Sequence, residues 1–154
     1  MGEGTLKDII IRKAEIADAE AIVRLEEREF SFPHSKEQII NEICDPQHYI
    51  IIADSNDSFA AYAGMYYIID EAYITNVVVD TEFRRKHIAD MLIDDMICFC
   101  HTNEITSLSL EVRQSNIPAI ELYKKHSFNI EAVLKNYYSN PKENAYIMTN
   151  RSLT

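Results

Sequence analysis

The sequence predicts an α/β (α+β) fold in which about four helices flank a mixed central sheet of six to seven strands. An apolar strand over residues 73–79, a helix from residue 88 and a strand over residues 106–112 form a β-α-β unit, so these two strands should be parallel with a right-handed crossover. Two earlier apolar strands, joined to the first by short turns, indicate an antiparallel meander. With 154 residues, 47% of them hydrophobic, the chain is large enough for a core, and we expect residues 1–154 to form a single domain.

Strand and helix signals alternate in the first half of the chain. Residues 7–13 include three consecutive isoleucines, which are typical of a strand. Residues 17–30 repeat apolar side chains at helical spacing, with acidic side chains on the other face. Ser35 is followed three residues later by a glutamine, so a capping box should start a second helix there. The next two strands are expected over residues 48–53 and 59–69.

The alternation continues through the second half of the chain. A helix over residues 88–101 would place four apolar side chains on one face, namely Ile88, Leu92, Met96 and Phe99. Asn116 is a good N-cap, and the proline two residues later is tolerated in a first helical turn, so another helix should run to about residue 126. Two closing strands are expected over residues 128–138 and 144–149.

Charge and composition exclude several classes of partner. The formal net charge of −10 argues against binding to nucleic acid or to an anionic membrane surface, and it is compatible with an amine or basic peptide as substrate. No apolar run approaches the ~18 residues of a membrane-spanning helix. The N-terminal residues lack the basic-then-apolar order of a secretory signal, so we expect a cytoplasmic protein. Cys44, Cys98 and Cys100 cannot all pair internally, and we expect three reduced, partly buried thiols and no metal site.

Two features point to chemistry on a phosphate-bearing carrier. Arg84, Arg85 and Lys86 lie between a strand and a helix start, where backbone N–H groups can cradle an anion. A solvated basic surface is the alternative interpretation. Glu111 near a strand end and Tyr123 on the following helix are a plausible general base and general acid. Together they suggest transfer of a group from such a carrier to an acceptor that must lose a proton.

Four segments give the chain a specific family resemblance: residues 76–80, 110–116, 119–123 and 136–138. On these residues the chain resembles the GNAT superfamily of acetyl-coenzyme A-dependent N-acetyltransferases, and within it the RimI-type ribosomal-protein alanine acetyltransferases. The resemblance implies the GNAT fold, with a sheet that is splayed at its centre. It also implies direct transfer of acetyl from acetyl-coenzyme A to a primary amine, preferably a protein N-terminal α-amine such as that of a ribosomal protein, without a metal or a covalent enzyme intermediate.

The resemblance further implies a cofactor site. In the family the pantothenate arm of the cofactor enters between the splayed strands, and Val78 matches the position whose N–H holds the thioester oxygen. The family's pyrophosphate loop follows Gln/Arg-x-x-Gly-x-Gly/Ala, and His87 stands in place of its first glycine, which should weaken backbone contact with phosphate or turn the ring outward. Ser127 likewise replaces a glycine where a left-handed backbone is expected. The matching cofactor residues are Val77, Val78, Val79, Arg84, Arg85, Lys86, His87, Ile88, Ala89 and Asn116.

Catalytic and acceptor-binding roles follow from the same resemblance. Glu111 matches the general base that takes the proton of the acceptor ammonium, and we expect it to be partly buried. A structural pair with Arg113 or with a lysine is the alternative. Tyr123 matches the general acid that protonates the departing coenzyme A thiolate, with a plain core tyrosine as the alternative. Tyr137 and Tyr138 match tyrosines that line the slot for the acceptor peptide, and Tyr138 is expected to matter more.

Two other functions fit much of the same pattern. A small-molecule N-acetyltransferase acting on a polyamine or an aminoglycoside would share everything up to Tyr123 and be indifferent to changes at Tyr138. A degenerate, non-catalytic acyl-coenzyme A-binding module is the other, since His87 departs from the loop pattern. In each case a monomer or weak homodimer is expected, with no nucleic-acid or membrane partner.

Overall fold

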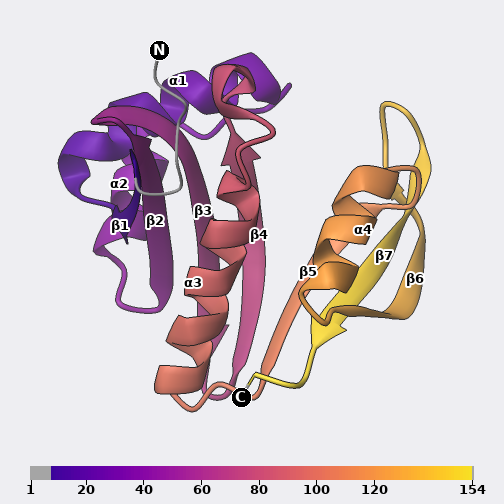
Figure 1. Cartoon of the computed structure of the whole chain (residues 1–154). Helices are drawn as coiled ribbons and strands as arrows, with labels where there is room; N and C mark the ends of the chain where they lie inside the picture. The colour runs from indigo at the N-terminus through magenta and orange to yellow at the C-terminus, as the bar shows by residue number, and fades with distance from the viewer. Residues whose placement is uncertain (1–7, 154) are drawn as a thin grey trace. The chain divides into compact units, whose positions relative to one another are not determined.

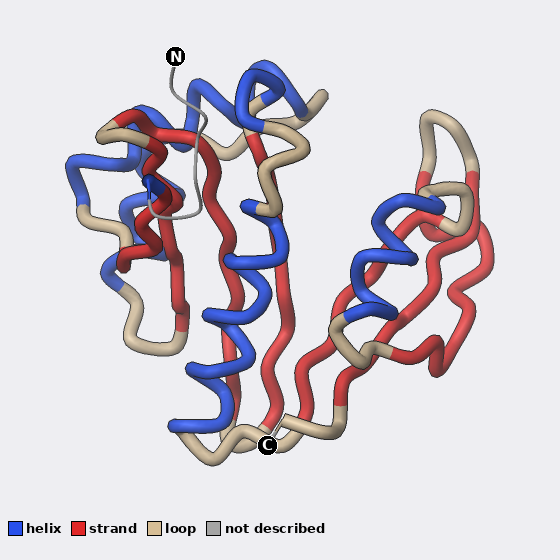
Figure 2. The backbone as a smooth tube through the Cα atoms, in the orientation of Figure 1, coloured by secondary structure: helices blue, strands red, loops and turns tan. Residues whose placement is uncertain are grey.

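The computed structural model describes residues 8–153, which form seven strands and four α-helices in the predicted order (Figure 1) (Figure 2). The strands are β1 (Ile9–Lys13), β2 (His48–Ser55), β3 (Ser58–Ile68), β4 (Glu71–Val79), β5 (Ser107–Arg113), β6 (Asn129–Tyr138) and β7 (Glu143–Asn150). The helices are α1 (Ala19–Glu29), α2 (Lys36–Cys44), α3 (Ile88–Thr102) and α4 (Ile117–Lys125). Two 3₁₀ turns, η2 (Ile16–Asp18) and η3 (Thr81–Phe83), come before α1 and α3. The predicted fold class is confirmed.

All seven strands belong to one mixed sheet with the order β1-β2-β3-β4-β5-β7-β6. β1, β2 and β3 pair antiparallel, as the predicted meander requires. β5 runs parallel to β4, which confirms the predicted β-α-β unit, and β7 runs antiparallel to both β5 and β6. β7 is therefore the direct neighbour of β5, and β6 lies one strand further away.

The parallel ladder between β4 and β5 is short. It pairs Glu71–Tyr73 with Ser107–Ser109, although β4 continues to Val79 and β5 to Arg113. The antiparallel ladder between β5 and β7 instead extends through Arg113. The C-terminal part of β5 is therefore held by β7.

The chain divides into two compact units that interleave in sequence. The first contains the described residues up to Tyr66 together with Thr75–Asp95, and the second contains Tyr67–Ile74 and the described residues from Met96 onward. The first unit has a core of buried side chains from α1, α2 and four strand or loop segments: Ala14, Ala19, Ile22, Leu25, Ile39, Ile50, Ile52, Tyr62 and Val78. The largest fully buried side chains of the second unit include Leu108, Phe128 and Met148. The expectation of a single domain stays a prediction.

Helix starts follow the sequence signals closely. At α2 the Ser35 hydroxyl accepts the Gln38 N–H at 3.2 Å, and the Gln38 side-chain oxygen accepts the Ser35 N–H at 2.8 Å. At α4 the Asn116 side-chain oxygen accepts the Ala119 N–H at 3.3 Å. Both predicted caps are therefore formed, because each satisfies backbone donors that a helix start leaves unpaired.

The first predicted helix begins later than expected because a 3₁₀ turn occupies residues 16–18. The Arg12 guanidinium binds both oxygens of Asp18 at 2.8 Å and also Asp54 at 2.6 Å. Asp18 in turn accepts the Glu15 N–H at 2.7 Å. These bonds fix the chain in a turn before α1 and, with the Arg12 bond as the main cause, hold the pKa of the Asp18 carboxyl below its usual value.

One acidic residue of α1 lies on the inner face, contrary to the expectation that the acids lie opposite the apolar stripe. Glu26 is fully buried and accepts hydrogen bonds from the His34 backbone N–H at 2.8 Å and from the Tyr62 hydroxyl. The His34 ring Nδ1 lies 2.9 Å from the same carboxylate. These polar partners offset the cost of removing the carboxylate from water.

The cysteines differ in exposure. Cys100 is buried, whereas Cys44 and Cys98 are exposed, so the expectation of partial burial is wrong for those two. Cys98 and Cys100 lie on different faces of α3, as their spacing requires. Within residues 8–153, none of the helices has the length and apolar character needed to span a membrane.

Candidate active site

The basic turn that precedes α3 contains two residues with a left-handed backbone. Arg85 and His87 adopt left-handed conformations with φ of 65° and 60°, and Arg84 is extended with φ of −68° and ψ of 159°. His87 is the first acceptor of the helix, because its carbonyl receives the Met91 N–H at 3.2 Å. A turn of this kind at a helix start exposes successive N–H groups that can converge on an anion.

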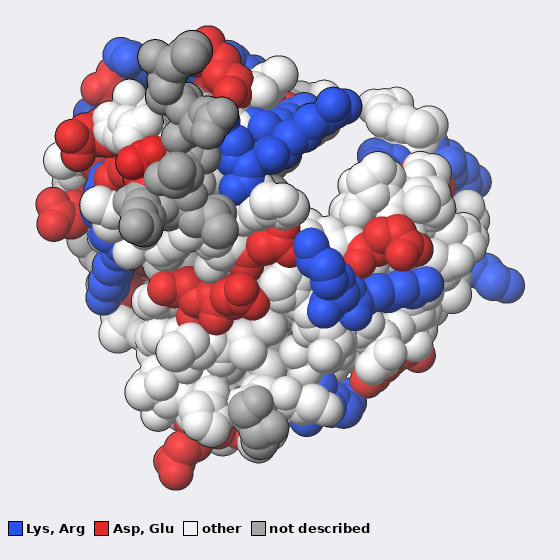
Figure 3. Space-filling view, viewed as in Figure 1, with Lys and Arg blue, Asp and Glu red and all other residues white. Residues whose placement is uncertain are grey.

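The three basic side chains of this turn have different partners. Arg84 donates to Glu29 at 3.1 Å and to the Val79 carbonyl at 3.3 Å. Lys86 lies 5.6 Å from the centre of the Phe83 ring. Arg85 is exposed and makes no ion pair with any of residues 8–153. Figure 3 shows Lys and Arg side chains gathered on the viewed face above the loop that leads into α3. Part of the positive charge is thus available to an anionic group.

His87 occupies a backbone conformation that suits glycine. Its side chain is 74% exposed, and its Nδ1 lies 3.4 Å from Asp90. The ring therefore points outward, which is one of the two expected results of replacing the family's glycine. Ser127, the other replacement, also has a left-handed backbone, with φ of 68°. His87 and Ser127 thus both carry a side chain at a position with a positive φ, a conformation that favours glycine.

The three valines of β4 differ in burial. The Val78 side chain is 7% exposed and belongs to the core of the first unit. Val77 and Val79, whose side chains point to the opposite face, are half-buried. The following residue, Asp80, gives its N–H to the Ala60 carbonyl at 2.9 Å.

In the second unit, the proposed base has a phenol as its partner. Glu111 lies on β5, and the Tyr137 hydroxyl donates to its Oε2 at 3.2 Å. Glu111 is exposed, so the expectation of partial burial is wrong. The alternative pairing with Arg113 is also wrong, because Arg113 contacts Glu143 instead. The charge of Glu111 raises the pKa of the Tyr137 phenol, which keeps that proton on the hydroxyl.

A bulge in β6 brings two neighbouring tyrosines together. Adjacent side chains of a regular strand point to opposite faces. In β6, however, Asn136 has a positive φ of 55°, and the register with β7 shifts between Leu134 and Tyr138. The Tyr137 and Tyr138 rings consequently meet edge to face with their centres 5.0 Å apart. Tyr137 is thereby placed on the Glu111 carboxylate, next to Tyr138.

Tyr123 lies on α4 and packs against Phe128 with ring centres 5.6 Å apart. Burial raises the pKa of Tyr123 to about 12, and the neighbouring Tyr138 adds to the effect. The phenol therefore keeps its proton throughout the neutral range, as a general acid must before it acts. The second unit thus brings together a carboxylate and three phenols.

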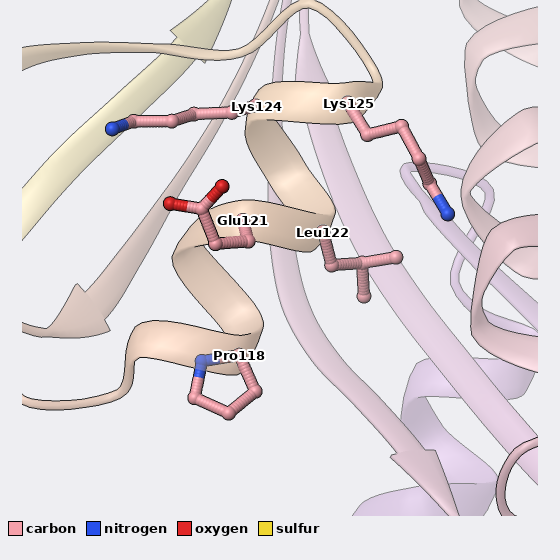
Figure 4. A pocket seen from close by; sticks show the side chains of 5 residues that line it. All are labelled: Pro118, Glu121, Leu122, Lys124 and Lys125. Carbon is pink, nitrogen blue, oxygen red and sulfur yellow. The ribbon is translucent and has the colours of Figure 1, made fainter.

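An open pocket runs along the outer side of α4. It is lined by Pro118, Glu121, Leu122, Lys124 and Lys125. Figure 4 shows the two lysines extending in opposite directions from the last turn, with Glu121 and Leu122 one turn earlier. The lining therefore combines two cations, one carboxylate and apolar side chains. The sequence analysis missed it, although two consecutive lysines after Tyr123 were a visible signal.

The residues expected to form one site belong to two units. Val77–Val79 and the turn over residues 84–89 lie in the first unit. Glu111, Asn116, Tyr123 and the two tyrosines of β6 lie in the second. Each group lies within its own unit: a basic turn before a helix start in one, and a carboxylate with three phenols in the other.

Comparison with known proteins identifies relatives along most of the chain. The family described as "Acetyltransferase (GNAT) family" matches residues 19–128. The ribosomal protein bS18-alanine N-acetyltransferase of Salmonella typhimurium is 33% identical over 85% of this chain and 89% of its own length. The protein of that name from Escherichia coli is 30% identical over 90% and 94%. A crystal structure of the Escherichia coli ribosomal-protein-S18-alanine N-acetyltransferase matches with a TM-score of 0.85 and 29% identity, covering 92% of each chain.

Proposed function

Because this chain belongs to the acetyltransferase (GNAT) family, we propose that it transfers acetyl from acetyl-coenzyme A to the α-amine of a protein N-terminus, such as that of a ribosomal protein. The observation that carries the proposal is the Glu111–Tyr137 pair with Tyr138 and Tyr123 in the same unit. The similarity to relatives named for alanine acetylation on a ribosomal protein supports the choice of acceptor.

Glu111 acts as the general base in this proposal. An α-amine has a pKa of roughly 7.7–8.0, so at neutral pH most acceptor molecules carry a proton that must leave before attack. Glu111 is exposed, and among residues 8–153 its carboxylate has one hydrogen-bond partner, the Tyr137 hydroxyl, so an approaching ammonium can reach the carboxylate. Glu111 takes the proton directly or through a water molecule.

Tyr123 acts as the general acid, and the two β6 tyrosines orient the acceptor. A phenol with a pKa of about 12 is protonated at working pH and can donate a hydrogen bond to a departing thiolate. Full proton transfer requires the pKa of Tyr123 to fall when the cofactor is bound, because a thiol has a pKa of roughly 8.5. The hydroxyls of Tyr137 and Tyr138 are hydrogen-bonding groups for the backbone of the first acceptor residues. Since it is Tyr137 whose hydroxyl touches Glu111, we now assign it a role at least equal to that of Tyr138.

The cofactor would supply an acetyl thioester joined to a pyrophosphate-bearing arm. The left-handed backbone at Arg85 and His87, ahead of the N-terminus of α3, fits a pyrophosphate in conformation and charge. In the proposal, Arg84, Arg85, Lys86, His87, Ile88 and Ala89 hold that group. In the first unit, the backbone of Val77, Val78 and Val79 is proposed to contact the arm. In the second unit, Asn116 is proposed as a separate contact to the cofactor. We further propose one catalytic domain acting in the cytoplasm without a metal.

Peptide acetylation is the direct test. The protein is incubated with acetyl-coenzyme A and either a peptide carrying a ribosomal-protein N-terminus or spermidine, and thiol release is followed together with product mass. We expect acetylation of the peptide α-amine and little turnover of spermidine. Preference for spermidine would instead favour the small-molecule enzyme.

Calorimetry with acetyl-coenzyme A addresses the remaining alternative. A measurable heat of binding together with peptide turnover supports the enzyme. Binding without turnover of either amine would indicate the non-catalytic module. A peptide whose α-amine is blocked but which contains lysine is the matched control, because acetylation of that peptide would place the acceptor on a side chain.

A further inference from the structure

We propose that Arg113, held by Glu143, is a positioning residue that fixes the Tyr138 ring and thereby sets the affinity for the acceptor peptide. The inference rests on the proposed function, in which Tyr137 and Tyr138 line the acceptor slot. It adds two residues to which the family resemblance gave no role in acceptor binding.

The Arg113 side chain is held on three sides. It follows Glu111 by two residues on β5, so both side chains project from the same face of the strand. Its Nη1 donates to the Pro141 carbonyl at 3.0 Å and lies 3.3 Å from Glu143 Oε1. Its Cζ lies 4.2 Å from the centre of the Tyr138 ring, within the range of a cation–π contact. The Arg113 guanidinium is therefore held over one face of the Tyr138 ring.

Glu143 holds the Arg113 guanidinium in place through contacts at the start of β7. Its Oε1 meets Arg113, and its Oε2 accepts the Ser115 N–H at 2.6 Å. Glu143 is also the cross-strand partner of Tyr138 in the β6–β7 ladder. The bonds from Ser115 and Arg113 lower the pKa of the Glu143 carboxyl, so it is ionised at neutral pH and keeps the guanidinium in place.

The fixed ring is connected to the groups proposed for chemistry. Tyr138 meets Tyr137 edge to face at 5.0 Å and an interplanar angle of 89°, and Tyr137 donates to Glu111. Tyr138 also contributes to the raised pKa of Tyr123. Without Arg113, the Tyr138 ring would rotate away from Tyr137 and the acceptor slot would change shape. Glu111 and Tyr123, the proposed base and acid, would still be present.

The test compares steady-state constants for Arg113→Met, Arg113→Lys and Glu143→Gln with the wild type. A cation–π contact has a strength equivalent to roughly 2- to 30-fold in a binding constant. For Arg113→Met we therefore expect the KM for the peptide to rise about 10-fold, with the KM for acetyl-coenzyme A unchanged. Arg113→Lys should raise the KM for the peptide less than Arg113→Met does, because lysine keeps the charge. The KM for the peptide in Glu143→Gln should lie between the values of Arg113→Lys and Arg113→Met.

Arg151→Met is the matched control. Arg151 binds Glu131 through two bonds of 2.8 Å in the same unit and touches none of the tyrosines discussed here. It should leave both KM values unchanged. An unchanged peptide KM in Arg113→Met, or equal rises in both KM values, would overturn the proposal, because the second pattern indicates general structural damage.

A second readout does not depend on turnover. With ring-labelled tyrosine, the NMR signals of Tyr138 and Tyr137 should shift in Arg113→Met and Glu143→Gln and stay in place in Arg151→Met. Unmoved signals in Arg113→Met would also overturn the proposal. If the wild type acetylates no amine, the proposed function fails, while the ring signals still decide whether Arg113 positions Tyr138.

Discussion

His87→Gly separates two effects of the histidine that stands in the anion-binding turn. The first is backbone strain, since a φ of 60° costs an L-residue roughly 1–2 kcal/mol. Glycine removes that cost. Glycine also increases the conformational entropy of the unfolded chain, which lowers the free energy of unfolding by about 0.5–1 kcal/mol. The free energy of unfolding should therefore rise by about 0–1.5 kcal/mol, equivalent to at most ~6 °C in Tm.

The second effect concerns the cofactor. Strain is present with and without ligand, so relieving it does not by itself change the dissociation constant. Removing the Cβ and the ring does, because the backbone N–H groups of the turn can then approach phosphate oxygens closely. A hydrogen bond to a charged group contributes about 1.5–3 kcal/mol, so recovering a good part of one should lower the Kd for coenzyme A about 10-fold. Isothermal titration calorimetry measures this change, and urea unfolding measures stability.

Two variants control the interpretation. His87→Ala removes the ring but keeps a Cβ at the same positive φ, so it should recover less affinity than glycine. Ser127→Gly relieves the same kind of strain, at φ of 68°, away from the turn, and should change stability without changing Kd. A His87→Gly protein whose Kd equals that of wild type within twofold would refute the argument. A weaker Kd in His87→Gly would show instead that the histidine side chain contributes to binding the cofactor.

Three further outcomes are expected. Glu111→Gln should lower kcat about 10²- to 10⁴-fold near neutral pH with little change in the Kd for coenzyme A, and full activity in stopped assays would remove it as the base. Tyr123→Phe should lower kcat by about 10²-fold or more. Because the pKa of Tyr123 is raised to about 12, the wild-type kcat should show no alkaline loss from this group below about pH 10, and an earlier loss that is absent in the phenylalanine variant would contradict the assignment. Asp18→Asn should lower the free energy of unfolding by about 1–3 kcal/mol at pH 7, because Arg12 loses a two-bond partner. The folded-state pKa of Asp18 is depressed, so its contribution is present above the unfolded-state value and is lost as pH falls through the folded one. Urea unfolding at pH 7 and pH 3 should therefore show a smaller difference between Asp18→Asn and wild type at the lower pH, and an equal difference would contradict it.

Local signals in the sequence predicted the elements well because those elements depend on neighbours in the chain. The caps at Ser35 and Asn116 form as expected, since each bond spans three residues. The left-handed positions at His87 and Ser127 were also visible, because each stands where the family resemblance expects glycine. The boundary of α1 was displaced because Arg12 binds Asp54, 42 residues away, as well as Asp18.

The sequence by itself determined which chemical groups the protein has and on which elements they lie: Glu111 on a strand, Tyr123 on a capped helix, and a basic turn before α3. Only the tertiary structure decided their partners. Glu111 pairs with Tyr137, 26 residues away, although β7 lies between β5 and β6, and the register of β6 with β7 shifts just before Tyr138. Strand order, register and bulges depend on the packing of the whole sheet, so no local pattern of residues specifies them.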